Sequence, residues 1–440
     1  MLNYAQLSAH GSDRATAYNM SNKIVRRDGQ LFAAWLDAPL GPAQPSRVQL
    51  GVCDARGLLQ TSFQLGSGID NHCGPALALD ASGRMHAIIG AHAGDFHYRY
   101  ADDPAAPQGW SEPETLGPAD TYPALAVSAN GTLHLAHREK GERWQLWYRR
   151  KKLGCAWDAP RVMAVSPTPG YNHFMQSLSL GPEGSIHLLF QFHYAESGRA
   201  IDCKGRAIVH LQSDDNGQSW FNEGRRCDDL PLTIASMQPV CHYPEGEVRV
   251  GNHVVDAQNQ PWFYASTPSK SGGGLWHRSA DGWHARDLAE LCASLAPEQA
   301  ARFAHLDVGH GRSSSISRDR AGQIHLILAT NPNGQAVRWY DPSLELFYWL
   351  VDAKGHLVAL QQVSSPDPDS AHWLPALEQW DWAQPQRACA EAPWFMYTAG
   401  LNLGGIGGDN ANTMTTKVFL GRLPLHGHGE ESWVLPREDV

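Results

Sequence analysis

Long apolar runs are missing from this chain of 440 residues: none approaches the roughly 20 residues that a membrane-spanning helix requires. The first 19 residues, MLNYAQLSAHGSDRATAYN, also lack the basic start and following apolar segment of a signal peptide. Basic residues are in deficit, with 35 Lys and Arg against 45 Asp and Glu, a formal net charge of −10. Because general nucleic-acid binders carry a basic surface, we do not expect nucleic acid as a partner. The missing apolar runs argue against a membrane as a partner. We expect the protein to be a monomer.

Helix-forming stretches are scarce as well. One stands out, DLAELCASLAPEQAARFA from Asp287 to Ala304, and Pro297 interrupts it. The chain holds instead 42 Gly, 28 Pro and 16 Trp, a composition typical of short strands joined by turns. Eight cysteines in a chain of this length do not imply a disulfide framework. These features together predict an all-β protein.

A pattern recurs along the chain: a polar or aromatic residue, a short apolar strand, a turn that contains glycine, and a second apolar strand. Three clear copies run from Asp70 to His92, from Thr121 to Arg138 and from Tyr171 to His193. Further copies follow Asn252 and Gly311, and weaker ones lie near each end of the chain. Successive turns from Gly83 to Gly322 are 48 to 75 residues apart, as in four-stranded propeller blades with insertions. Seven copies predict one domain over residues 1–440, a seven-bladed antiparallel β-propeller.

Two other repeated features favour the same fold. The segment SDDNGQSW from Ser213 to Trp220 fits the Asp-box pattern, which turns the chain between the third and fourth strands of a blade. SADGW, from Ser279 to Trp283, is a shortened form. Four histidines recur at one position of the second strand, and a residue repeated in this way indicates architecture rather than a unique site. They are His86, His134, His187 and His325.

Blade topology also predicts which residues share a face. The first strand of a blade starts on the face to which the second strand returns, so first-strand starts and second-strand ends of adjacent blades lie together. The residues at these positions are His72, His92, Tyr122, Arg138, Tyr171 and His173. We expect all six to line one end of the ring.

These residue types suit proton transfer beside a bound anion. Histidine and tyrosine can act as general acids and bases, and arginine binds a carboxylate through two parallel hydrogen bonds. A tyrosine beside cations is expected to ionise more easily. No paired carboxylates fall on this face, which argues against glycoside hydrolysis by two carboxylates.

The segments DNHCGPALALDASGRMHAIIGAH and TYPALAVSANGTLHLAHR resemble the signature blades of the propeller-type ulvan lyases, polysaccharide lyase families 24 and 25. Family 25 is the more similar. The resemblance implies a secreted or periplasmic seven-bladed propeller that cleaves a uronic-acid polysaccharide, ulvan above all, by β-elimination. Its specific motifs cover only residues Asp70 to Arg138, and Cys73 stands where a small residue such as glycine is expected.

The resemblance also implies roles. His72 and Tyr122 match the proton-transfer pair, either of which removes the C5 proton of the uronate; Tyr122 then protonates the leaving oxygen. Arg138 matches the residue that neutralises the uronate carboxylate, and His92 matches the second histidine of the site. The intervals of 20 residues from His72 to His92 and 16 from Tyr122 to Arg138 agree with the family. No catalytic metal is implied.

A structural zinc site is a separate expectation. In the blade pattern His193 ends a second strand, Cys203 precedes the third and Cys227 follows the fourth, which places all three on one side. Cys241 is expected as the fourth ligand, with His242 as the alternative. Mixed Cys and His ligands suit Zn²⁺, and the resembling families hold a structural zinc.

Outer substrate contacts are expected at the remaining first-strand starts. These residues are Tyr171, His173, His253 and Arg312. The polymer, and whether cleavage is internal or terminal, stay open.

Two rival functions share the predicted fold. A sialidase-type hydrolase needs three arginines around a carboxylate and an early Arg-Ile-Pro-like motif, which the sequence does not show. A non-catalytic carbohydrate-binding propeller would not need His, Tyr and Arg gathered at one end of the ring.

Overall fold

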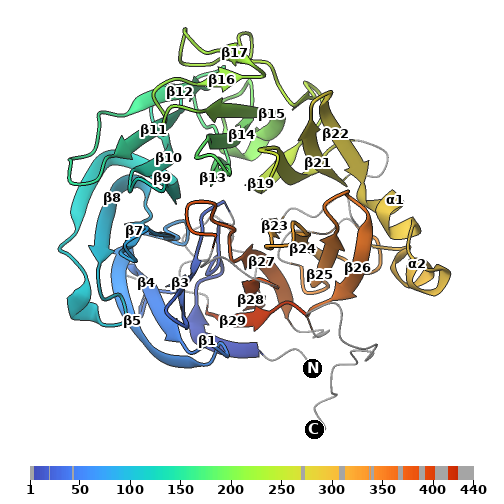
Figure 1. Ribbon diagram of the computed structural model, residues 1–440, viewed down its shortest axis with the longest axis horizontal. Coiled ribbons are helices and arrows are strands. Elements are labelled where there is room, and N and C mark those ends of the chain that lie inside the picture. The colour runs from blue at the N-terminus through green and yellow to red at the C-terminus, as the bar shows by residue number, and fades with distance from the viewer. Residues whose placement is uncertain are drawn as a thin grey trace.

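The computed structural model describes residues 4–18, 20–41, 44–268, 273–306, 313–335, 337, 341–364, 370–385, 392–401 and 415–424. Nearly all of its regular structure is β, in curled antiparallel sheets. Figure 1 shows these sheets following one another around a common centre. The all-β prediction is confirmed, and the arrangement is propeller-like.

Two large sheets contain the strands from Tyr4 to Val165, together with three strands from the C-terminal region. The seven-stranded sheet runs in chain order through β6 (Ala76–Leu79), β7 (Met85–Ile89), β8 (His92–Ala101), β9 (Glu114–Val127), β10 (Leu133–Glu139), β11 (Gln145–Lys151) and β12 (Arg161–Val165). The eight-stranded sheet contains β1 (Tyr4–Gly11), β2 (Ile24–Arg27), β3 (Gln30–Asp37), β4 (Ser46–Cys53) and β5 (Leu59–Gly68) from the N-terminal region, with β27 (Ala371–Leu377), β28 (Trp394–Gly400) and β29 (Thr416–Arg422). Since β1 pairs with both β29 and β3, the two ends of the described chain join in one sheet.

Three smaller sheets complete the ring. The first holds β13 (Ser177–Leu180), β14 (Ile186–Tyr194), β15 (Lys204–Ser213), β16 (Phe221–Asn222), β17 (Arg225–Arg226) and β18 (Cys241–His242). The second holds β19 (Arg249–Val255), β20 (Pro261–Ser266), β21 (Gly273–Ser279) and β22 (Gly282–Asp287), and the third holds β23 (Ser313–Arg318), β24 (Ile324–Thr330), β25 (Glu345–Val351) and β26 (Leu357–Gln362). A cavity of about 90 Å³ lies among the inner strands, lined by residues of β2, β6, β9 and β13.

The predicted turns of the repeat are present. Gly83, Gly131, Gly184 and Gly322 join the two inner strands of their units with φ between +79° and +88°, a conformation that L side chains rarely adopt. Asp80 shows how such a turn is closed, because its carboxylate accepts hydrogen bonds from the backbone N–H groups of Ser82 and Arg84. The local sequence therefore determines where each hairpin reverses.

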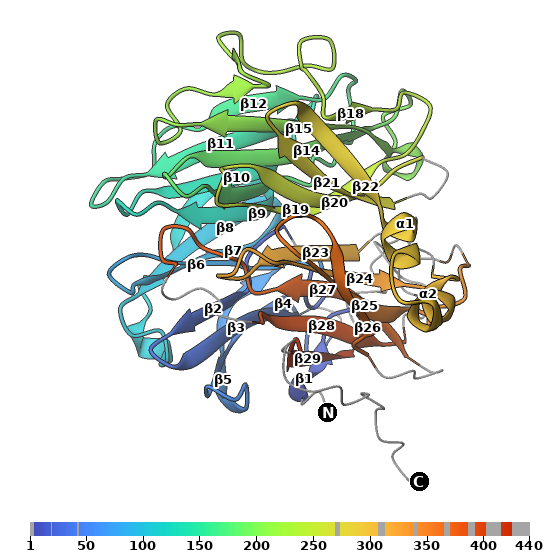
Figure 2. The same cartoon turned by 45° about the vertical axis from the view of Figure 1, so that its right-hand side comes forward.

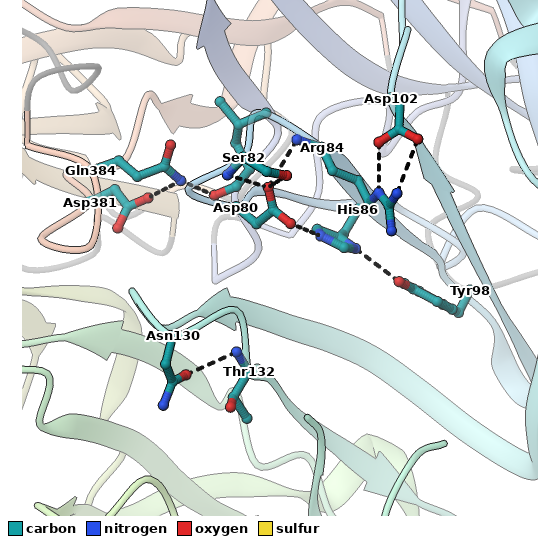
Figure 3. A network of polar contacts seen from close by, with 11 residues as sticks. Asp80, Ser82, Arg84, His86, Tyr98, Asp102, Asn130, Thr132, Asp381 and Gln384 are labelled. Carbon is teal, nitrogen blue, oxygen red and sulfur yellow. Dashed lines mark hydrogen bonds and ion pairs between the residues drawn. The ribbon is translucent and has the colours of Figure 1, made fainter. Parts of the chain in front are cut away.

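The recurring histidines are structural, as predicted. His86, His134 and His325 place Nδ1 at 2.7–2.9 Å from the hydroxyl of a tyrosine on the next strand, and His187 bonds instead to the ring of His210. Figure 3 shows the His86 example, in which the ring joins Asp80 to Tyr98. Each pair ties the second strand of a unit to its third.

The burial of these rings makes stability depend on pH. Burial lowers the pKa of His134 to about 3 and that of His187 to about 4, whereas an unfolded histidine titrates near 6.5. The unfolded chain therefore binds more protons below pH 6.5, and stability falls as pH decreases from about 6.5 towards 4. Each histidine is expected to contribute up to about 1.4 kcal/mol per pH unit. Denaturant unfolding at pH 7, 6 and 5 measures the slope. His134→Gln, which keeps a polar side chain beside Tyr148, should reduce this slope by the contribution of one histidine. Equal free energies of unfolding at pH 7 and pH 5 would contradict the prediction.

The Asp box and the helical insertion also lie where the sequence places them. Asp215 accepts hydrogen bonds from the backbone of Gln218 and Ser219 in the turn between β15 and β16, and Trp220 is buried. The helices are α1 (Leu288–Ala293), capped by the Asp287 carboxylate, and α2 (Pro297–Phe303). Two short 3-10 turns cover Pro107–Gly109 and Ala200–Asp202. Both helices lie on the rim beside β22 and β26 (Figures 1 and 2). No helix in the described residues is long and apolar enough to cross a membrane.

Candidate active site

The structure brings five of the predicted residues together at one end of the inner strands. The rings of His72 and His92 stack with centroids 3.9 Å apart, and the ring of Tyr122 lies 6.2 Å from His72. His173 follows at 4.9 Å from Tyr122, and the Arg138 guanidinium lies 4.5 Å from the Tyr122 ring centre. Residues up to 101 positions apart thus form one cluster, in agreement with the topological argument.

The loop between β5 and β6 holds His72 through Asp70. One Asp70 oxygen accepts from the backbone N–H of His72 at 2.8 Å and lies 3.1 Å from its ring Nδ1. Cys73 is completely buried, and a Cβ on Gly68 would lie 2.1 Å from the Cβ of Cys73, so Gly68 makes room for the larger side chain.

Asp70 orients both histidines. Its second oxygen lies 2.5 Å from Nδ1 of His92, which is the first residue of β8 rather than the last residue of the preceding strand, as the sequence pattern suggested. An ionised carboxylate only accepts hydrogen bonds, so each neutral ring carries its proton on Nδ1 and leaves the lone pair of Nε2 available. Burial alone would raise the pKa of Asp70, but its bonds to His72 and His92 hold that pKa far below its usual value.

Burial keeps His72 and Tyr122 uncharged. It lowers the pKa of His72 to about 3, and the nearby Arg14 adds to this effect. Burial raises the pKa of Tyr122 well above 10, and the opposing charges of Arg138 and Arg14 do not offset it. The expectation that the Tyr122 phenol ionises more easily is therefore wrong for the free protein, because desolvation outweighs its cationic neighbours.

Tyr122 occupies a strained position inside a long strand. The sequence pattern placed it at the start of a strand, but β9 is continuous from Glu114 to Val127 and pairs first with β8 and then with β10. The register shifts between Ala136 and Arg138, opposite Tyr122, whose φ is +61°. A bulge redirects a side chain, and a tyrosine with positive φ is uncommon, as expected where backbone strain serves a site.

Arg138 is buried behind the rings of the candidate site. Its guanidinium has no solvent exposure and lies 4.3–5.1 Å from the ring centres of Tyr122, Trp144 and Tyr171. One hydrogen bond, of 3.4 Å, runs from Nη1 to the Asn172 carbonyl, while Nε and Nη2 have no hydrogen-bond partner. A buried cation with unsatisfied donors is costly to the fold and indicates a functional requirement.

Two residues that the sequence analysis missed complete the cluster. The ring of Tyr18 lies 4.6 Å from Tyr122 and 6.4 Å from His72, and its hydroxyl accepts a hydrogen bond from Arg14. Both residues come from the loop between β1 and β2, outside the recognisable repeat. Arg14 is almost completely buried and brings a second positive charge to the site.

The predicted outer contacts separate into three groups. Tyr171 and His173 are partly exposed and adjoin the cluster, and burial holds the pKa of His173 well below its usual value. His253 is completely buried inside β19, where its Nδ1 lies 2.6 Å from the Ser177 hydroxyl, so it is not placed to touch a substrate. The pattern put His253 at a strand start, but β19 begins four residues earlier, at Arg249. Arg312 lies outside the described residues.

The predicted zinc ligands do not form one group in this structure. His193 and Cys203 flank the Lys204 end of β15, and Cys241 pairs with Ile208 at its middle. Cys227 bonds through its backbone to Trp220 near the Ser213 end, about 20 Å along the strand. The expected fourth strand would have carried Cys227 back to the end of the sheet that holds His193. Instead, β16 has only two residues, and the chain reverses into β17 near the opposite end. Zinc binding itself stays a prediction.

Two other groups of side chains in the described residues have metal-ligating atoms within 4.8 Å of one another. They are Asp70 with His72 and His92, and Asp120 with His137 and Glu139. The first is part of the cluster described above, where Asp70 already bonds to both rings.

Comparison with known proteins agrees with the fold. A family model described as BNR repeat-containing family member matches residues 27–291. No curated protein matches the sequence. Among solved structures, a PL25 ulvan lyase bound to -[GlcA(1-4)Rha3S]- is 15% identical, with a TM-score of 0.67 over 90% of this chain and 93% of that one.

Two further structures show the same likeness. The polysaccharide lyase Uly1 is 10% identical with a TM-score of 0.60, over 96% of this chain and 98% of that one. The BP39L lectin from Burkholderia pseudomallei is 13% identical with a TM-score of 0.51, over 88% and 98%. At these identities the likeness establishes a propeller-like fold and nothing finer.

Proposed function

The chain belongs to the BNR repeat-containing family, and we propose that it is a polysaccharide lyase that cleaves a uronic-acid polysaccharide, ulvan in the first instance, by β-elimination. The observation that carries the proposal is the cluster itself: a neutral histidine with a free Nε2, a protonated tyrosine and two arginines within one site. The PL25 ulvan lyases among the similar structures support the choice of polymer.

The environments of His72 and Tyr122 support one division of the two proton transfers. His72, whose Nδ1 proton is held by Asp70, accepts the C5 proton of the uronate on Nε2. The electron pair of the broken C5–H bond forms the C4–C5 double bond, and the bond from C4 to the leaving oxygen breaks. Tyr122, protonated in the free enzyme, donates its hydroxyl proton to that oxygen. A proton then returns from His72 to the tyrosinate, which restores both groups.

The two arginines, Arg14 and Arg138, lower the energy needed to remove the C5 proton of the uronate. Negative charge accumulates on the uronate carboxylate as that proton leaves, and positive charge held in a water-poor site stabilises it. Arg138 supplies this charge from below Tyr122, and Arg14 supplies it from the side of Tyr18. No water and no metal ion takes part in these steps.

The test is an assay for unsaturated uronyl products, which absorb ultraviolet light, on a panel that includes ulvan and other glucuronate- and iduronate-containing polysaccharides. Absorbance should rise with at least one polymer, without a matching release of saturated ends. Binding without any cleavage across the panel would favour a carbohydrate-binding propeller, and saturated products would favour a hydrolase.

Asp70→Asn is expected to reduce turnover although Asp70 does not touch the reacting atoms. An amide can donate as well as accept, so it no longer fixes the Nδ1 proton of His72 or of His92. The loss should lie within the roughly 10²–10⁴-fold range of general acid–base catalysis, with a smaller change in KM. Asp80→Asn, at the structural histidine His86, is the matched control. Equal turnover in the two variants would remove the positioning role of Asp70.

We also propose a seven-bladed architecture and a structural zinc ion. The large sheets each divide into two four-stranded units, at the β1–β3 pairing and at the bend of β9, and the smaller sheets supply one unit each, which supports seven blades in one domain. Binding of a structural Zn²⁺ stays a prediction that metal analysis of the purified protein tests, although Cys227 lies too far along β15 to share one ion with His193 and Cys203.

A further inference from the structure

A second cluster of ionisable side chains lies on β9 and β10, close to Tyr122 and Arg138 in the sequence. Asp120 of β9 and His137 of β10 have completely buried side chains, with His137 Nδ1 at 3.0 Å from Asp120 Oδ1. Glu139, also on β10, brings a carboxylate oxygen into the same space. Neither the elimination chemistry nor the repeated histidine pairs uses these three residues.

Several polar atoms of this cluster are unsatisfied. Apart from the contact between His137 Nδ1 and Asp120 Oδ1, the atoms Asp120 Oδ2, His137 Nε2 and Glu139 Oε2 are buried without a hydrogen-bond partner. The rings of Phe96 and Trp147 pack against His137, at centroid distances of 5.4 and 6.0 Å. Native proteins rarely leave so many buried polar atoms unpaired in one place, so a group that binds them is expected there.

The charges are also out of balance. Two carboxylates face one guanidinium: a Cβ on Gly117 would lie 2.8 Å from Asp120 Oδ2 and 3.3 Å from Arg149 Nη2, which places both groups against this glycine. A proton or a cation must compensate.

We propose that Asp120, His137 and Glu139 bind one divalent metal ion of the Mn²⁺ and Zn²⁺ class. Carboxylate oxygen and imidazole nitrogen are ligands that both ions accept. A proton shared by the two carboxylates would leave Nε2 of His137 unsatisfied, whereas a metal ion takes one atom from each of the three residues. A groove of about 470 Å³, lined by Glu139, Lys140 and Trp147 among others, gives the ion a route from solvent.

The metal would join β9 to β10 beside the proposed catalytic residues. Asp120 is two residues before Tyr122, and His137 and Glu139 flank Arg138. The ion therefore fastens the two strands at the register shift that turns Tyr122 into the site. This role is structural and does not depend on the lyase proposal.

The test measures Mn²⁺ binding to the full chain, from which bound metal has first been removed with a chelator. The electron paramagnetic resonance signal of free Mn²⁺ reports how much of the ion stays unbound. Mn²⁺ is chosen because thiolate sites strongly prefer Zn²⁺, so the predicted cysteine site does not contribute. One ion per chain should bind. Asp120→Asn and Glu139→Gln should each weaken binding at least about 10-fold, an effect typical even of metal-site residues outside the ligand shell. Glu142→Gln, an exposed carboxylate in the same groove, and His92→Gln, in the other candidate group, should bind Mn²⁺ like the natural chain.

Thermal unfolding gives a second readout that does not rely on activity. Saturating Mn²⁺ should raise the Tm of the natural chain by about 2 °C or more, and should leave the Tm of Glu139→Gln unchanged. Glu139 is partly exposed, so this variant should fold even if Asp120→Asn does not. Absence of Mn²⁺ binding, or binding that survives in Glu139→Gln or fails in His92→Gln, would overturn the proposal.

Discussion

Tyr122→Phe should abolish most of the lyase activity while leaving the protein folded. The substitution removes one hydroxyl and keeps the ring that packs against Tyr18, His173 and the Arg138 guanidinium. Without the hydroxyl the leaving oxygen has no positioned acid, and the loss should reach roughly 10²–10⁴-fold in kcat. The measurement is the initial rate of unsaturated-product formation, with circular dichroism and Tm as checks of the fold.

Tyr148→Phe is the matched control for this experiment. Tyr148 is equally buried and lies in the same sheet, but its hydroxyl bonds to the structural histidine His134. Its removal should lower stability by about 1 kcal/mol and leave turnover unchanged. A folded Tyr122→Phe protein with near-normal activity would show that Tyr122 is neither acid nor base, and the proposed mechanism would have to be abandoned.

The sequence predicts the repeating part of the fold well because that part is determined locally. A glycine with positive φ, as at Gly83 or Gly131, marks each turn within a few residues of chain. The repeated histidines could be set aside for the same reason, and the structure pairs His86 and His134 with tyrosines on adjacent strands. Local signals of this kind do not depend on distant parts of the chain.

The convergence of His72, His92, Tyr122 and Arg138 could also be predicted, because blade topology alone places strand ends of neighbouring units together. The electrostatics could not. The cationic neighbours expected beside Tyr122 suggested a phenol that ionises easily, yet burial raises its pKa instead. The extent of burial depends on packing between units, which no single segment of the sequence reveals.

The missed and misplaced residues have a common origin. Arg14 and Tyr18 come from the loop between β1 and β2, which carries no repeat signal, and they reach the site only through the closure of the ring. His253 was assigned to a strand start because the beginning of β19 could not be located. Cys227 was predicted beside His193 because the sequence did not reveal that β16 has only two residues. Strand boundaries are set by pairing partners, and these are distant in the sequence.

Arg138→Met should be at least as damaging to activity as the loss of the tyrosine hydroxyl. Methionine fills much of the space under the rings of Tyr122, Trp144 and Tyr171 but carries no charge, so the uronate charge would stay unneutralised as the C5 proton departs. Loss of one such stabilising group costs roughly 10²–10³-fold in kcat. Arg138→Lys should recover little, because an ammonium cannot stack between the rings as a planar guanidinium does.

The control for Arg138 must separate charge from packing, and the chain offers a close match. Arg318 is also buried and stacks on two tryptophans, Trp380 and Trp382, with its guanidinium 4.7 and 4.5 Å from their ring centres. Arg318→Met removes a comparable cation–π contact, worth about 0.5–2 kcal/mol, away from the candidate site. Both variants should therefore change the stability to a similar extent, and only Arg138→Met should lose turnover. If product formation fell in proportion to stability in both, Arg138 would be a packing residue, and the positive charge required for elimination would have to come from Arg14.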